Sequence, residues 1–136
     1  MLVADDHRDF CVAMEELLTT LGFRVICASD GLDALEKLTA NPVSVILTDL
    51  YMPQMDGVEF IQRLGASGKK IPPVIAITGD EHAASRSVSY AAKALGARAA
   101  LLKPFTREQL AQAIAFVLAS GESVEQTANG MRVSME

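Results

Sequence analysis

The sequence predicts an α/β fold, a doubly wound parallel five-stranded sheet with helices on both faces. Short β-rich runs alternate with helix-patterned segments over the first 119 residues, which is typical of consecutive βαβ units. The run at 43–48 is apolar at nearly every position, as expected of a central strand covered on both faces. With half of its 136 residues apolar, the chain is long enough to close one hydrophobic core.

The first strand is predicted at 2–4, where an apolar run meets two aspartates. Apolar residues at helical spacing from 10 to 21 predict the first helix. Gly22 ends this helix, because glycine readily adopts the backbone conformation of a helix C-terminus. The β-rich run at 23–28 then predicts the second strand.

The second helix is predicted to open at Asp30-Gly31 and to end before Pro42, because the residue before a proline disfavours the helical conformation. The run at 43–48 is the third strand. A loop with Met52-Pro53 follows, and the apolar residues at 58, 60, 61 and 64 predict a third helix up to Gly65.

The fourth strand is predicted to begin near Val74, because the prolines at 72 and 73 cannot lie inside a strand. An Ala- and Ser-rich helix is predicted at 81–95, and a short fifth strand at 99–102. Thr106 and Gln109 form a capping-box pattern that begins the last helix.

The segment 120–136 is polar and weakly patterned, so we interpret it as a C-terminal tail or linker after a domain of residues 1–119. The handedness rule for parallel crossovers leaves few topologies for five βα units. The flavodoxin-like strand order 2-1-3-4-5 is the commonest of them.

Composition excludes several functional classes. Twelve Lys and Arg against seventeen Asp and Glu give a net charge of −5, which argues against non-specific nucleic-acid binding. No apolar stretch approaches the roughly 20 residues that span a bilayer, and no signal peptide is visible. The two cysteines have no C-x-x-C spacing, which favours reduced thiols and a cytoplasmic protein.

Chemically reactive side chains follow four of the five predicted strands. They are Asp5 and Asp6 after the first strand, Asp49 after the third, Thr78 after the fourth and Lys103 after the fifth. Ligands of such sheets bind outside the carboxyl ends of the strands, near the switch point beside strand one. The sequence therefore predicts one site that contains all five residues.

This set of residues suits phosphoryl chemistry. Three neighbouring carboxylates repel one another, so they must protonate or share a cation. Oxygen ligands without His or Cys favour Mg²⁺. Lys103 can neutralise a phosphoryl oxygen and Thr78 can hydrogen-bond another, while a carboxylate can attack phosphorus to give an acyl phosphate.

Over about residues 1–119 the chain resembles the receiver domains of bacterial two-component response regulators, the CheY-like superfamily. The resemblance rests on five motifs in order, namely Leu-Val-Ala-Asp-Asp at 2–6, Asp-Leu-Tyr-Met-Pro-Gln-Met-Asp-Gly at 49–57, Ile-Thr at 77–78, Gly-Ala at 96–97 and Lys-Pro-Phe at 103–105. Together their order and spacing are highly specific.

The resemblance implies that Asp49 is the phosphoacceptor and takes its phosphoryl group from a sensor histidine kinase or a histidine phosphotransfer protein. It implies that Asp6 binds Mg²⁺ directly and that Asp5 binds it largely through water. It also implies that Asp49 and the backbone carbonyl of Tyr51 are the remaining protein ligands of the metal.

By the same resemblance, Thr78 and Lys103 hold the phosphoryl oxygens and the Lys103–Pro104 peptide bond is cis. It also implies that Met52-Pro53 and Asp56-Gly57 shape the loop after Asp49 and start the third helix. The domain is then a switch and not an enzyme beyond its own phosphorylation and dephosphorylation. Its output is a protein target bound through the face of helix four, strand five and helix five. A monomer or weak homodimer is expected, without direct nucleic-acid or membrane binding.

One position departs from the family. Most receivers carry an aromatic residue three positions before the lysine, and here that residue is Ala100. Ala100 is not expected to touch metal or phosphate, so the chemistry should survive. We hypothesise that the signal passes through backbone movement of the Thr78 loop and the helix at 81–95.

Other interpretations stay open. Asp5-Asp6 could cap a helix, and His7 is expected to start helix one at the rim of the site. A pseudo-receiver that binds partners without phosphate is one alternative function. An Asp-nucleophile phosphatase is a weaker one, because that chemistry needs an acid two residues after the nucleophile, where this chain has Tyr51.

Overall fold

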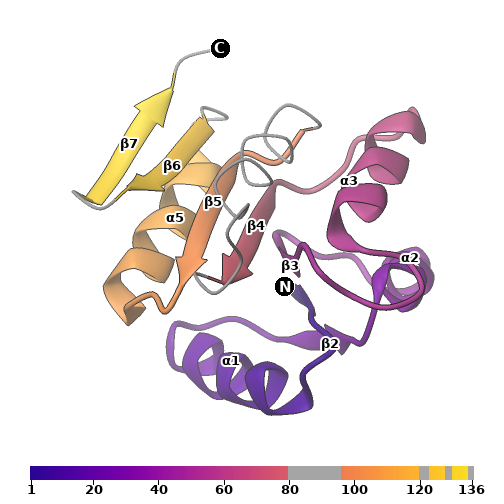
Figure 1. Ribbon diagram of the computed structural model, residues 1–136, viewed down its shortest axis with the longest axis horizontal. Helices are drawn as coiled ribbons and strands as arrows, with labels where there is room; N and C mark the ends of the chain where they lie inside the picture. Colours follow the sequence, from indigo (N-terminus) through magenta and orange to yellow (C-terminus); the bar gives the residue numbers. More distant parts are fainter. Residues whose placement is uncertain (80–95, 120–122, 128–129, 135–136) are drawn as a thin grey trace.

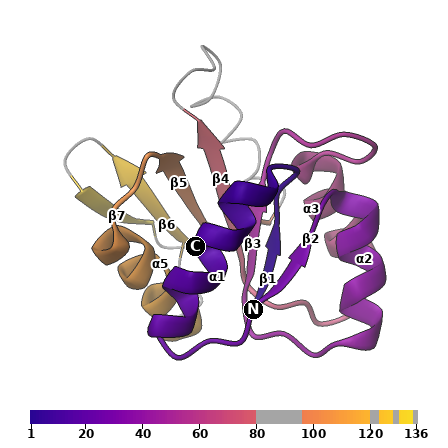
Figure 2. The same ribbon diagram turned by 90° about the horizontal axis from the view of Figure 1, so that it is seen from below.

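The computed structural model describes residues 1–79, 96–119, 123–127 and 130–134. Its sheet has the strand order β2-β1-β3-β4-β5-β6-β7. Figure 1 shows β4 to β7 one after another, and Figure 2 labels β1 between β2 and β3. The strands are β1 (Leu2–Ala4), β2 (Ile26–Ala28), β3 (Ile46–Asp49), β4 (Val74–Gly79), β5 (Ala99–Lys103), β6 (Ser123–Thr127) and β7 (Gly130–Ser134). The described helices are α1 (Arg8–Thr20), α2 (Gly31–Ala40), α3 (Gly57–Ala66) and α5 (Arg107–Ala119).

The first five strands confirm the predicted parallel sheet of order 2-1-3-4-5. Helices α1 and α5 cover one face of the sheet, and α2 and α3 cover the other (Figure 2). The helix expected at 81–95 lies outside the described residues. Among the residues that are described, no helix has both the length and the apolar character that a membrane crossing requires.

Alternation along the strands divides the core into two layers, because successive side chains of a strand point to opposite faces. In β1, Val3 packs under α1 and α5, whereas Leu2 and Ala4 pack under α2 and α3. Burial on both faces explains why these strands are apolar at consecutive positions.

The predicted helix ends match the structure closely. Gly22 follows α1 with φ of +92°, a left-handed conformation that favours glycine. At the start of α5, the N–H of Gln109 donates to Thr106 Oγ1 at 3.0 Å, and the N–H of Thr106 donates to Gln109 Oε1 at 2.8 Å. The capping box predicted at this position is therefore confirmed.

The segment interpreted as a tail contains two strands that the sequence analysis did not predict. β6 pairs in parallel with β5, and β7 pairs antiparallel with β6. These pairings rest on backbone hydrogen bonds at the edge of the sheet, where no apolar alternation is required. The domain boundary at residue 119 stays a prediction. The edge of β5 that faces away from β4 is paired with β6.

Candidate functional site

The residues expected at the strand ends lie at the carboxyl edge of the sheet. Asp49 and Lys103 are the last residues of β3 and β5, and Thr78 is the penultimate residue of β4. Asp5 follows β1 directly, and its backbone N–H donates to the Ala28 carbonyl at 3.0 Å. The parallel register of the strands is what brings these distant positions to one edge.

Lys103 joins two buried carboxylates. Its ammonium lies 3.1 Å from Asp5 Oδ2 and 3.2 Å from Asp49 Oδ2. Asp5 is 2% exposed and Asp49 is 7% exposed, so neither carboxylate is well solvated. The ammonium also lies 4.0 Å from the centroid of the Phe10 ring, which adds a cation–π contact. Lys103 thus directly contacts two other predicted site residues, Asp5 and Asp49.

Burial dominates the electrostatics of the acceptor candidate. Loss of hydration raises the pKa of Asp49, although the N–H of Tyr51 and the charge of Lys103 oppose this shift. Burial by itself would lower the pKa of Lys103, but the charges of Asp49 and Asp5 outweigh it and raise that pKa. Lys103 therefore stays an ammonium beside the poorly solvated carboxylate of Asp49.

His7 lies beside the aspartates of the site. It begins α1 at the rim, as predicted, and its imidazole points toward two of these carboxylates. His7 Nδ1 lies 3.1 Å from Asp5 Oδ1 and 3.3 Å from Asp6 Oδ1. Ligand atoms of Asp5, Asp6, His7 and Asp49 all lie within 4.8 Å of one another. The adjacency of His7 to the two aspartates was the sequence signal for this placement.

The Thr78 hydroxyl is buried and makes no hydrogen bond to the described part of the chain. Thr78 is 0% exposed, and its Oγ1 has no hydrogen-bond partner among the described residues. A buried hydroxyl without a partner is costly, so such a group commonly serves a ligand. This hydroxyl lies on β4, between the strands that end in Asp49 and Lys103.

The loop after Asp49 holds the Asp49 side chain in place. The N–H of Tyr51 donates to Asp49 Oδ1 at 2.9 Å, and the N–H of Gly57 donates to the Leu50 carbonyl at 3.2 Å. Asp56 caps α3 by accepting from the N–H of Glu59 at 2.8 Å. This arrangement agrees with the prediction that Asp56-Gly57 starts the third helix.

Two expectations from the fifth strand can be compared with the structure. The Lys103–Pro104 peptide bond is cis, as the resemblance implied. Ala100 is buried and pairs with Ala76 of β4 and with Glu125 of β6. The position of the family's aromatic residue therefore lies inside the sheet and carries only a methyl group.

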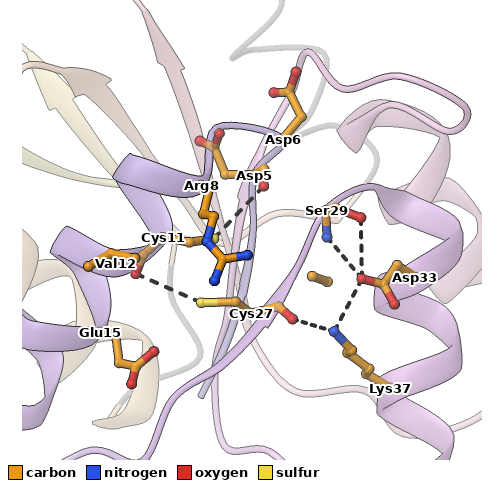
Figure 3. A pocket seen from close by; sticks show the side chains of 11 residues that line it. Asp5, Asp6, Arg8, Cys11, Val12, Glu15, Cys27, Ser29, Asp33 and Lys37 are labelled. Atoms are coloured by element: carbon orange, nitrogen blue, oxygen red, sulfur yellow. Dashed lines mark hydrogen bonds and ion pairs between the residues drawn. The ribbon is translucent and has the colours of Figure 1, made fainter.

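The aspartates Asp5, Asp6 and Asp49 form an acid cluster. A pocket of about 420 Å³ lies next to this cluster, between α1, β2 and α2, and Figure 3 shows the residues that line it. Cys11 lies in its wall, and burial, with the nearby Cys27, raises the pKa of the Cys11 thiol to about 12. Because the thiolate is the reactive form, Cys11 is an inert packing residue. This agrees with the expectation of reduced thiols.

On the far side of this pocket, Asp33 should contribute pH-dependent stability. Its Oδ2 accepts from the N–H of Ser29 at 3.0 Å and from Lys37 Nζ at 3.2 Å (Figure 3). These contacts hold the pKa of Asp33 below its ordinary value. A carboxyl group with a lowered pKa stabilises the fold above its unfolded pKa, and this contribution is lost as pH falls through the folded pKa.

We therefore expect Asp33→Asn to lower the free energy of unfolding by about 0.5 kcal/mol at pH 7. The effect is small because ion pairs near the protein surface contribute little to stability. Urea unfolding of both proteins should show this difference shrinking as pH falls below about 3.9, the ordinary Asp pKa. A difference that stays constant through the acid range would contradict the assignment.

Similarity to known proteins identifies the family of this chain. Residues 1–115 match the response regulator receiver domain family. The chain is 28% identical over 137 aligned residues to the sensory/regulatory protein RpfC of Xanthomonas campestris pv. campestris, covering 98% of this chain and 18% of that protein. It is 33% identical over 115 residues to the sensor histidine kinase RcsC of Salmonella typhi, covering 85% of this chain and 12% of that protein. The chain thus spans less than a fifth of these relatives.

Solved structures agree with this assignment. A putative response regulator from Chloroflexus aurantiacus superposes with a TM-score of 0.77 at 26% identity, covering 88% of this chain and 97% of that one. The receiver domain of NtrX from Brucella abortus shares the fold with a TM-score of 0.79 at 21% identity, covering 88% of this chain and 98% of that one. By its matching family, its relatives and its fold, this chain belongs to the response regulator receiver domains of two-component systems.

Proposed function

We propose that this receiver domain accepts a phosphoryl group on Asp49 from a phosphohistidine of a sensor kinase or phosphotransfer protein, with Mg²⁺, and thereby switches its protein contacts. The observation that carries the proposal is the placement of Lys103 between Asp49 and Asp5, at 3.2 Å and 3.1 Å. An ammonium there can neutralise the charge that a phosphoryl group brings to Asp49. Relatives that include sensor kinases support a phosphorylation partner of this kind.

The transfer needs few protein groups. A carboxylate oxygen of Asp49 attacks phosphorus, and the P–N bond to the donor imidazole breaks as the new P–O bond forms. The electron pair of the broken bond goes to the imidazole nitrogen, which takes a proton from solvent. Lys103 balances charge on one phosphoryl oxygen, and the buried Thr78 hydroxyl donates to another.

The donor set fits Mg²⁺. Asp5, Asp6 and Asp49 supply hard carboxylate oxygens within reach of one another, and we assign the backbone carbonyl of Tyr51 as a further ligand. When bound, the ion supplies positive charge to the phosphoryl oxygens. Because an acidic cluster is costly without a cation, Mg²⁺ and Lys103 share the neutralisation.

We propose that the domain binds its downstream protein target through the predicted face formed by the helix at 81–95, β5 and α5. We also propose that the protein is cytoplasmic and is a monomer or a weak homodimer. Pairing of β6 with β5 leaves less of that face for a partner. With Ala100 at the aromatic position, we expect phosphorylation to shift amide resonances of residues 81–95 and of β5. Two-dimensional NMR tests this, and unchanged resonances at these positions would contradict readout through the Thr78 loop and the helix predicted at 81–95.

The proposal is tested by incubating the protein with acetyl phosphate and Mg²⁺ and measuring its intact mass. We expect one phosphoryl adduct in the wild type, none in Asp49→Asn, and none when Mg²⁺ is chelated. Asp56→Asn is the matched control, because Asn also caps helices well and should keep the adduct. Absence of the adduct from the wild type would favour a pseudo-receiver, and steady hydrolysis of a phosphomonoester would favour a phosphatase.

A further inference from the structure

The imidazole of His7 faces the acid cluster. Nδ1 lies 3.1 Å from Asp5 Oδ1 and 3.3 Å from Asp6 Oδ1, while the side chain as a whole is 72% exposed. A ring nitrogen thus adjoins two carboxylates of the proposed metal site, on the side open to solvent. The Lys103 ammonium contacts the other oxygen of Asp5, Oδ2, so it does not compete for this position.

The separations suit ligands of one ion. Two ligand atoms that each lie about 2.0–2.1 Å from a metal are about 3 Å apart at a right angle and about 3.4 Å apart at a tetrahedral angle. The two distances from His7 Nδ1 fall between these values. One ion can therefore be bound by Nδ1 and the carboxylate oxygens with little movement of α1.

Helix capping does not account for this side chain. His7 occupies the N-cap position of α1 with φ of −92° and ψ of 108°, yet its side chain makes no capping hydrogen bond. Ser, Thr, Asp and Asn are the residues that stabilise this position. The imidazole contacts the carboxylates of Asp5 and Asp6 instead. This position suits a side chain that binds a metal ion together with these carboxylates.

Resting on the function proposed above, we propose that His7 is an additional ligand of the metal site. Its nitrogen shifts the selectivity of the site from Mg²⁺ toward nitrogen-preferring divalent ions such as Ni²⁺, Co²⁺ and Zn²⁺. The physical reason is ligand preference, since Mg²⁺ selects oxygen ligands and dehydrates reluctantly, whereas imidazole suits the later transition metals. His7 is thus a specificity-determining residue for the ion and takes no part in the attack on phosphorus.

The test measures Ni²⁺ and Mg²⁺ affinity by calorimetry on tag-free wild type and His7→Asn. Asn keeps a good helix cap, so the variant should fold. We expect the preference for Ni²⁺ over Mg²⁺ to fall on the order of tenfold or more, as for loss of a group that tunes a metal site. The visible bands of bound Ni²⁺ should also move to longer wavelength, because oxygen is a weaker-field ligand than nitrogen.

His82→Asn is the matched control, because it removes the other imidazole of the chain and should change neither the preference nor the spectrum. An unchanged preference and spectrum in His7→Asn would overturn the inference, as would equal losses in the two variants. Failure of the proposed function has a different signature, namely no phosphoryl adduct in the wild type with Mg²⁺. The wild-type adduct and the His7-dependent Ni²⁺ preference are therefore judged separately.

Discussion

Gly57→Ala is expected to destabilise the protein on the order of 3 kcal/mol, the upper part of the range for overpacking. A Cβ atom at this position would meet the carbonyl oxygen of Asp49 and would lie 2.8 Å from Leu50 Cα. Both are backbone atoms at the end of the central strand, so they cannot turn aside as a side chain can. Relief of the clash requires movement of the Asp49 backbone itself.

Urea unfolding of the wild type and the variant measures this effect. Gly22→Ala is the matched control, because Gly22 has φ of +92° and open space around its Cβ position. That substitution should cost only the strain of a left-handed backbone, about 1 kcal/mol. Equal losses in the two variants would show that the contact with Asp49 is not the constraint.

Lys103→Met is expected to lower the free energy of unfolding by about 2 kcal/mol at neutral pH without metal. Removing one partner of a buried ion pair leaves an uncompensated charge and typically costs about 3–5 kcal/mol. We expect less here because the Lys103 side chain is 25% exposed. Mg²⁺ should restore part of the loss, since a second cation can neutralise Asp5 and Asp49.

The loss should depend on pH in a defined direction. Burial raises the pKa of Asp49, so this carboxylate gains a proton at higher pH than an ordinary aspartate as the solution is acidified. The difference between wild type and variant should then be largest near pH 7 and shrink toward acid pH. Lys70→Met, at an exposed position, should cost about 0.5 kcal/mol or less. A loss independent of both pH and Mg²⁺ would contradict the electrostatic role of Lys103.

Much of the site could be predicted because parallel strands bring their carboxyl ends to one edge. Asp49, Thr78 and Lys103 each follow an apolar run in the sequence, and the structure places them at the ends of β3, β4 and β5. The residues that form these strands are buried on both faces. Their pattern is therefore strong, and the prediction of the sheet is confirmed.

Three features could not be predicted for physical reasons. Strands β6 and β7 are defined by backbone pairing at a sheet edge, which leaves little trace in a polar segment. The orientation of His7 depends on a side-chain torsion that the helix pattern does not fix. The close approach of Gly57 to Asp49 depends on the path of a loop, although the Asp-Gly pair indicated where α3 begins.

The central claim is that Asp49 carries the phosphoryl group. After reaction with acetyl phosphate and Mg²⁺, borohydride reduction converts a phosphorylated aspartate to homoserine, and tandem mass spectrometry of the peptides locates it. We predict homoserine at position 49 and unmodified aspartate at positions 5, 6 and 56. Homoserine at any of those other positions, or at none, would contradict the assignment of Asp49 as the phosphoacceptor.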